Sequence, residues 1–141
     1  MKKVSIAVIG CGRIGQMHAK NVQLHEKTNL ACIYDPNDEF AKKISIDLGI
    51  QAVKNVDEIF NNDEIDAVLI SSPTNTHIDF IEKSVAAKKP VFCEKPIDLD
   101  IHKVNECSKR LEGNTIPIQL GFNRRFDPGH QAAKKSLTNG E

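Results

Sequence analysis

The sequence lacks an excess of charge of either sign, because 19 Lys and Arg residues balance 19 Asp and Glu residues. No net field therefore favours a nucleic acid or a membrane surface as a partner. The sequence also lacks any apolar run near the roughly 18 residues that a membrane helix needs, and no stretch resembles a signal peptide. We expect neither a nucleic-acid partner nor a membrane, so partners must be sought at local sites.

Cysteine is scarce, with four residues at positions 11, 32, 93 and 107 that form no close pair. No Cys/His cluster has the spacing of a metal site, so we predict no bound metal. Cys32 and Cys93 lie inside apolar runs, where a reduced thiol packs as a small hydrophobic group. These features predict a reduced, cytoplasmic protein.

The length of 141 residues suits one domain with its own core, and repeats and low-complexity segments are absent. Apolar residues make up 40% and charged residues 27%, as in soluble globular domains. Short β-branched runs alternate with longer stretches of helical period. The predicted strands are 4–9, 30–35, a weak one around 51–53, 66–71, 90–94 and 116–121.

Helices are predicted between these strands, at 13–26, through Phe40, Ile44 and Leu48, around 57–60, and at about 76–88 and 99–112. Pro36-Asn37 starts the second of them, and Gly49 is well placed to cap its end. Continuous apolar strands separated by helices predict an α/β fold with a parallel sheet covered on both faces. Right-handed crossovers make it a doubly wound sheet (a Rossmann fold), most simply in the strand order 3-2-1-4-5-6. Pro117 suggests that the last strand is an edge.

Residues 10–15 read G-x-G-x-x-G directly after the first strand and at the start of a helix, which is the context of a phosphate-binding turn. Gly10 permits the turn, Gly12 lets the backbone approach a pyrophosphate, and Gly15 lets helix and strand pack closely. The helix N-terminus then offers N–H groups to the anion. Arg13 either lies along the pyrophosphate or faces solvent. The cofactor-binding residues predicted here are Gly10, Gly12, Arg13, Ile14 and Gly15.

Asp35 ends the second strand, where dinucleotide folds place the acid that binds the adenosine ribose. A carboxylate there accepts hydrogen bonds from ribose hydroxyls and repels a 2′-phosphate. Pro36 and Asn37 supply no arginine for that phosphate, so we predict NAD rather than NADP. The alternative is that Asp35 only caps the following helix. His18 falls on the apolar face of the first helix, which favours a packed core histidine.

Three polar clusters follow successive strands, at 71–77, 94–96 and 123–125. Ligands bind beyond the carboxyl ends of such strands, so the clusters predict one cofactor and substrate cleft. Each also has a structural alternative, as a helix cap, a solvated ion pair or surface arginines. Lys95 could orient a substrate hydroxyl or lower its pKa by its charge, and we predict it to be the catalytic residue. The Lys95–Pro96 bond is a candidate cis peptide.

Together these residues make the sequence resemble the glucose–fructose oxidoreductase / inositol dehydrogenase (Gfo/Idh/MocA) family over essentially its whole length. The resemblance lies in segments 10–15 with His18-Ala19, 34–36, 72–77, 94–96 and 121–128, and the last is most like inositol 2-dehydrogenases. It implies an N-terminal NAD(P)-binding domain and oxidation of a sugar or cyclitol hydroxyl, with hydride passing to the nicotinamide.

The resemblance also implies roles for particular residues. The lysine of the family's Glu-Lys-Pro motif lines the active site, which corresponds to Lys95. The resemblance implies further cofactor contacts by Asn75, His77 and Glu94 near the nicotinamide ribose, and by Asn123 and Arg125 beside the nicotinamide end. Ser72 and Pro73, in the same matching segment as Asn75, are also predicted to bind the cofactor.

One departure concerns the family's second, α+β domain, which carries a catalytic Asp and His and supports substrate contacts and homo-oligomer formation. The sequence has no place for it. We predict a dinucleotide-binding domain over 1–123 and a linker with a crossover helix over 124–141, starting at Asp127-Pro128. We expect the chain to bind NAD and to turn over slowly or not at all.

The leading hypothesis is thus the cofactor half of an NAD-dependent dehydrogenase that oxidises a cyclitol or sugar, with myo-inositol giving the 2-keto product. One alternative is a dehydrogenase for another polyol, a sugar acid or a sugar nucleotide. The other is a non-catalytic NAD-sensing module. Lys95 disfavours this alternative, because a sensor has no use for a lysine at the nicotinamide end. Neither the substrate nor the oligomeric state can be read from these residues.

Overall fold

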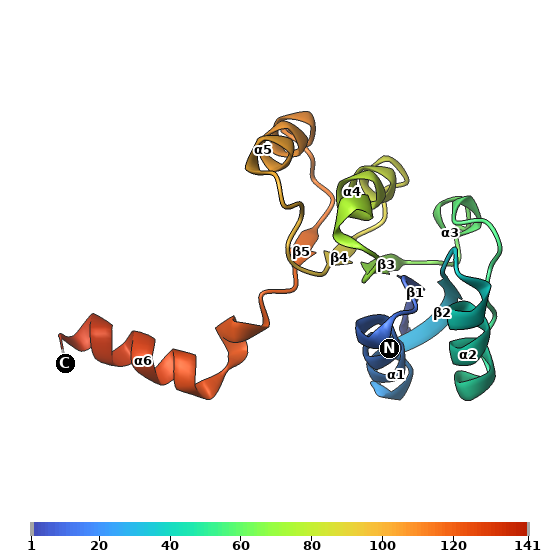
Figure 1. Ribbon diagram of the computed structural model, residues 1–141, viewed down its shortest axis with the longest axis horizontal. Coiled ribbons are helices and arrows are strands. Elements are labelled where there is room, and N and C mark those ends of the chain that lie inside the picture. The colour runs from blue at the N-terminus through green and yellow to red at the C-terminus, as the bar shows by residue number, and fades with distance from the viewer. Residues whose placement is uncertain (1, 141) are drawn as a thin grey trace.

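The computed structural model describes residues 2–140 and folds them around a parallel five-stranded sheet in the order β2-β1-β3-β4-β5 (Figure 1). Every strand pair in this sheet is parallel. The strands are β1 (Val4–Ile9), β2 (Thr28–Tyr34), β3 (Ala67–Ile70), β4 (Val91–Cys93) and β5 (Ile118–Leu120). The predicted doubly wound α/β fold is confirmed.

Helices cover both faces of this sheet, with α1 and α2 on one side and α3, α4 and α5 on the other (Figure 1). Two short 3-10 helices, η1 (Thr74–Thr76) and η2 (Asn123–Phe126), follow β3 and β5. The α-helices are α1 (Arg13–Leu24), α2 (Asp38–Leu48), α3 (Asp57–Phe60), α4 (His77–Ala86), α5 (Ile101–Arg110) and α6 (Pro128–Asn139).

Neighbouring residues of β1, which is paired on both sides, enter different cores. Val8 lies in a buried cluster with Ile44 of α2, whereas Ile9 lies in a second cluster with Ile59 of α3 and Ile81 of α4. Successive side chains of a strand point to opposite faces, so a strand covered on both faces must be apolar throughout. This explains why the central strands read as unbroken apolar runs.

The predicted third strand, 51–53, is reduced to a single bridge between Ala52 and Ile33. Its backbone pairs with β2 only through the two hydrogen bonds of Ile33, to the Gln51 carbonyl and from the Val53 N–H. Immediately afterwards the Glu58 side chain accepts a hydrogen bond from the Asn55 N–H, and the Asn55 side chain accepts one from the Asp57 N–H. These bonds begin α3 and end the extended segment. The observed order therefore matches the predicted order 3-2-1-4-5-6 without its first strand, so the sheet has five strands instead of six.

Local capping chemistry sets the ends of α2 and α6 as expected. The Asn37 side chain accepts hydrogen bonds from the N–H groups of Glu39 and Phe40, and Gly49 closes α2 in the left-handed conformation at φ 64°. Asp127 caps α6 by accepting from the His130 N–H. The sequence positions of both helix starts were thus correctly predicted.

The last helix, α6, extends away from the sheet beyond the edge strand β5 and has no buried residue (Figure 1). Pro117 precedes β5, the edge strand, as predicted. The assignment of 124–141 as a linker and crossover helix stays a prediction. Within the described residues, no helix is long and apolar enough to cross a membrane.

Candidate functional site

The strand ends that carry the predicted site residues meet at one edge of the sheet. Ile9 pairs with both Tyr34 and Ile70, and Cys93 pairs with Ile70 and Leu120. The residues that follow these positions are the phosphate turn, Asp35, Ser71, Glu94 and Gly121. Parallel register therefore brings the polar clusters after β3, β4 and β5 to the same edge as the glycine-rich turn.

The glycines of that turn occupy positions that a side chain would alter. Gly10 has φ +97°, and a Cβ there would collide with the backbone of Ser72. A Cβ on Gly15 would collide with the Gly10 carbonyl, so this residue allows α1 to approach β1 closely. A Cβ on Gly12 would meet nothing within 4 Å, which leaves open space beside the turn.

Helix α1 begins at this open space without a cap of its own. Gly12 is the N-cap residue, no side chain bonds to the first N–H groups, and no acidic residue lies in the first turn. The helix dipole and the N–H groups of the first turn therefore suit an anion. Arg13 is exposed and Ile14 half-buried, and their contact with the pyrophosphate stays a prediction. The residues present fit a dinucleotide pyrophosphate.

Asp35 holds the phosphate turn itself, a contact that the sequence reasoning did not foresee. Its Oδ2 accepts a 2.7 Å hydrogen bond from the Cys11 N–H, and its Oδ1 accepts one of 2.8 Å from the Asn37 N–H. Asn37, not Asp35, caps α2. The capping alternative is therefore wrong, whereas the ribose contact of Asp35 stays a prediction.

Ser71 joins the end of β3 to the phosphate turn. Its hydroxyl lies 3.0 Å from the Gly10 carbonyl and 3.2 Å from the Ile9 carbonyl, to which it donates. In the segment that follows, the Ser72 and Thr76 hydroxyls are bonded at 2.7 Å, while Pro73 and Asn75 are exposed. Pro73 and Asn75 are thus accessible to a ligand, and Ser72 is half-buried.

His77 is placed differently from the expectation that it faces the cofactor. The residue is 1% exposed, and its ring nitrogens Nδ1 and Nε2 lie 2.8 Å from the carbonyl oxygens of Pro96 and Ser72. The ring therefore lies behind the loop after β3 and joins it to the turn after β4. A cofactor contact of His77 stays a prediction, and this burial does not support it.

Glu94 and His18 form a half-buried pair beside Lys95. His18 Nε2 donates to Glu94 Oε1 at 2.8 Å, and the ring packs edge-on against Phe92 with centroids 5.5 Å apart. Glu94 Oε2 accepts from the Lys95 N–H at 3.2 Å. His18 is thus a bonded partner of the site rather than the core histidine expected from its helical face.

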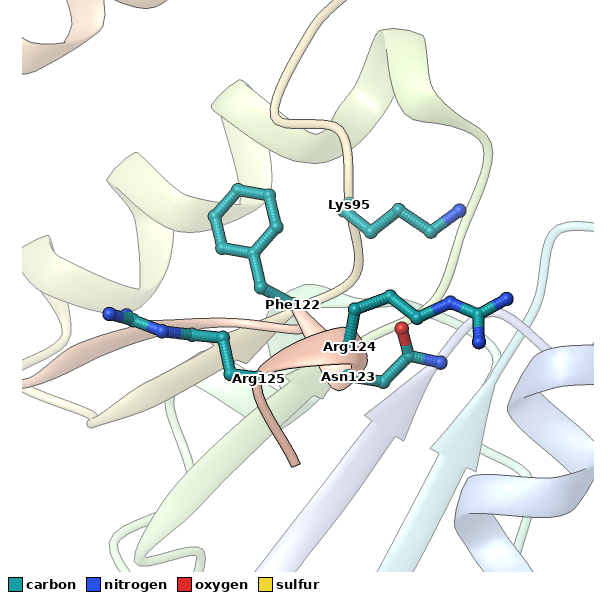
Figure 2. Close-up of a pocket in the computed structure, with 5 residues that line it drawn as sticks. All are labelled: Lys95, Phe122, Asn123, Arg124 and Arg125. Carbon is teal, nitrogen blue, oxygen red and sulfur yellow. The ribbon is translucent and has the colours of Figure 1, made fainter. Parts of the chain in front are cut away.

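Lys95 is exposed and lines a pocket of about 650 Å³ with four residues that follow β5 (Figure 2). Figure 2 shows the side chains of Lys95, Asn123 and Arg124 extending to the same side. The guanidinium of Arg125 extends in the opposite direction. The Lys95–Pro96 peptide bond is cis, as predicted.

The family resemblance implies a contact of Arg125 beside the nicotinamide end and gives Arg124 no role. Both arginines lie in η2, where about three residues make a turn, so adjacent side chains point about 120° apart. Only one of two consecutive arginines can then face Lys95, and no sequence signal says which. Arg124 takes that side and also pairs with Asp127 at 3.3 Å.

All four cysteines are free and buried. Burial, followed by the charge of Asp35, raises the pKa of the Cys11 thiol to about 12, and burial with Glu94 does the same for Cys93. A thiol with such a pKa is no nucleophile at neutral pH. Among the described residues, no group of His, Cys, Asp or Glu could hold a metal ion.

The arrangement defines a class of protein. A glycine-rich turn between a buried strand and an uncapped helix, with an acid at the end of the neighbouring strand, makes an NAD-binding Rossmann domain. Comparison with known proteins then gives the family. The chain belongs to the GFO_IDH_MocA oxidoreductase family, because the family model described as "Oxidoreductase family, NAD-binding Rossmann fold" matches residues 4–122.

Relatives include the inositol 2-dehydrogenase of Rhizobium meliloti (strain 1021), with 40% identity over 97% of this chain and 41% of the relative. A solved putative myo-inositol dehydrogenase from Sinorhizobium meliloti 1021 superposes with a TM-score of 0.87 and 39% identity, over 98% of this chain and 42% of that one. The scyllo-inositol dehydrogenase of Lactobacillus casei, solved with NAD(H) and scyllo-inositol, gives 0.89 and 32%, over 99% and 42%. The chain spans about 41% of the length of the curated relatives it matches.

Proposed function

We propose that this protein is the cofactor-binding part of an NAD-dependent dehydrogenase that oxidises a ring CH–OH group of a cyclitol, with myo-inositol as the first substrate to test. The observation that carries the proposal is the uncapped N-terminus of α1 beside Gly12, flanked by Asp35. The relatives named as inositol dehydrogenases support the cyclitol as substrate class.

The bound NAD supplies the acceptor for the hydride, and the protein holds both reactants. The first turn of α1 binds the pyrophosphate, and Asp35 accepts hydrogen bonds from the adenosine ribose hydroxyls. The ammonium of Lys95 contacts the substrate hydroxyl, whose pKa it lowers by its positive charge. Asn123 and Arg124, which extend to the same side as Lys95, border the space for the nicotinamide end and the substrate.

We also propose the setting in which this domain works. Residues 124–141 connect the cofactor domain to a second domain that completes the substrate site, and the whole protein assembles as a homo-oligomer, as the family resemblance implies. Four buried free thiols suit a reducing compartment, which supports a cytoplasmic location.

Thermal unfolding of the chain with increasing NAD⁺ or NADP⁺ tests the cofactor assignment. NAD⁺ at 100 times its dissociation constant should stabilise the fold by about 2.7 kcal/mol, and NADP⁺ should have little effect. No shift with either ligand would overturn the proposal. For the catalytic role, reduction of NAD⁺ by myo-inositol is followed at 340 nm in a protein that carries both domains. Full activity after Lys95→Ala would remove Lys95 from the mechanism.

A further inference from the structure

The turn that carries Lys95 is held from two sides by histidines of different helices. His18 of α1 bonds to Glu94, immediately before the lysine, and His77 of α4 bonds to the carbonyl of Pro96, immediately after it. Neither contact involves the lysine side chain, which stays exposed. We propose that His18 and His77 are positioning residues that direct Lys95 towards the nicotinamide end of the site, an inference that rests on the function proposed above.

The contact on the Glu94 side joins the turn to the phosphate-binding helix. The side chains of His18 and Glu94 are 16% and 20% exposed, so solvent weakens their 2.8 Å contact only in part. The second carboxylate oxygen of Glu94 accepts from the Lys95 backbone N–H. Gly121 lies against the same carboxylate, because a Cβ there would come within 3.2 Å of it. The Glu94 carboxylate is thus held by α1, by its own turn and by the segment after β5.

The contact on the Pro96 side joins the turn to the loop after β3. The two ring nitrogens of His77 face the carbonyl oxygens of Pro96 and Ser72, each at 2.8 Å. The ring therefore bridges the turn that carries Lys95 and the loop after β3.

If the two contacts direct the Lys95 side chain, they place its ammonium charge near the nicotinamide ring. The proposal can then be tested by comparing the binding of NAD⁺ and NADH. The nicotinamide ring is cationic in NAD⁺ and neutral in NADH, so a directed Lys95 ammonium weakens NAD⁺ binding relative to NADH. Two unit charges about 7 Å apart in a water-like dielectric repel each other enough to change a ratio of dissociation constants by about threefold. Loss of general stability would not move this ratio, because it affects both ligands alike.

The experiment measures NADH binding from the fluorescence of its reduced ring and NAD⁺ binding by competition. In the wild-type chain, Lys95→Met should lower the ratio Kd(NAD⁺)/Kd(NADH) by about threefold. His18→Phe, which keeps a ring against Phe92, and His77→Gln should each lower it by about twofold, because the lysine is then directed only part of the time. His102→Ala, at an exposed position on α5, is the matched control and should leave the ratio unchanged.

The double variants decide whether the histidines act through Lys95. In the Lys95→Met background, His18→Phe and His77→Gln should cause no further change in the ratio. A further drop there, or an unchanged ratio in the single histidine variants, would overturn the positioning role while the cofactor function stands. An unchanged ratio in Lys95→Met would overturn it too.

Failure of the proposed function has a different signature, namely that the wild-type chain binds neither NAD⁺ nor NADH. If the buried His77→Gln variant does not fold, as judged by circular dichroism, His18→Phe alone decides the question.

Discussion

Replacing Asp35 by alanine should separate the two tasks that the structure gives to one carboxylate. Asp35 accepts hydrogen bonds from two backbone N–H groups of the protein and is proposed to accept others from the adenosine ribose. Each bond to a charged group contributes about 1.5–3 kcal/mol at a protected site. Asp35→Ala should therefore both loosen the phosphate turn and weaken NAD⁺ binding.

The magnitudes can be estimated for each task. The half-buried bond to the Cys11 N–H should contribute about 1.5 kcal/mol to the stability of the unliganded chain, so Tm should fall by about 5 °C. Loss of the ribose contacts at about 2 kcal/mol should weaken NAD⁺ binding about 30-fold. The preference over NADP⁺ should narrow, because the carboxylate that repels the 2′-phosphate is gone.

Thermal unfolding with and without each dinucleotide measures both effects on the same samples. Asp38→Ala is the matched control, since its carboxylate is 77% exposed and pairs only with the equally exposed Lys54. It should leave NAD⁺ binding unchanged and lower stability by less than about 1 kcal/mol. NAD⁺ affinity within about threefold of wild type in Asp35→Ala would refute the ribose assignment. An unchanged Tm without ligand would refute the role in holding the turn.

Two further predictions concern the glycines of the phosphate turn and the buried cysteines. Gly12→Ala should fold with near-wild-type Tm and lose NAD⁺ binding, because its Cβ enters the open space where the pyrophosphate belongs, whereas Gly15→Ala should fail to fold, because its Cβ meets a carbonyl oxygen. Circular dichroism and NAD⁺ titration distinguish the two, and a folded, NAD⁺-binding Gly12→Ala would contradict the assignment. Native Cys11, Cys32 and Cys93 should resist iodoacetamide at pH 8, because burial raises their pKa values to about 12, 11 and 12. Rapid labelling of Cys11, detected by mass spectrometry, would show that the phosphate turn opens in solution.

Much of the site was predictable because its signals are local in the chain. The G-x-G-x-x-G segment follows an apolar strand directly, and the start of α2 at Asn37 and its end at Gly49 depend on neighbouring residues only. The meeting of three polar clusters at one edge followed from the parallel order of the strands. The predicted strand at 51–53 is only a single bridge, because the bonds of Asn55 and Glu58 begin α3 directly after it.

Contacts between segments distant in sequence could not be predicted. The bond from Cys11 to Asp35 spans 24 positions, and the pair of His18 with Glu94 spans 76. The position of His18 on the apolar face of α1 predicted that it is buried. Its contact with the Glu94 carboxylate could not be predicted, because it depends on where β4 ends in space relative to α1. Likewise, His77 follows a polar segment in the sequence, yet the residue is buried, with 1% of its surface exposed.

The sequence by itself thus indicates the Rossmann fold and its phosphate turn, since backbone propensity, capping and apolar period act over a few residues. Packing of the sheet and its helices decides the rest. It chooses Arg124 over Arg125 on the Lys95 side, turns His77 inward and brings two histidines to the two ends of one turn. These outcomes depend on the relative placement of whole elements, which is settled only when the cores on both faces of the sheet are filled.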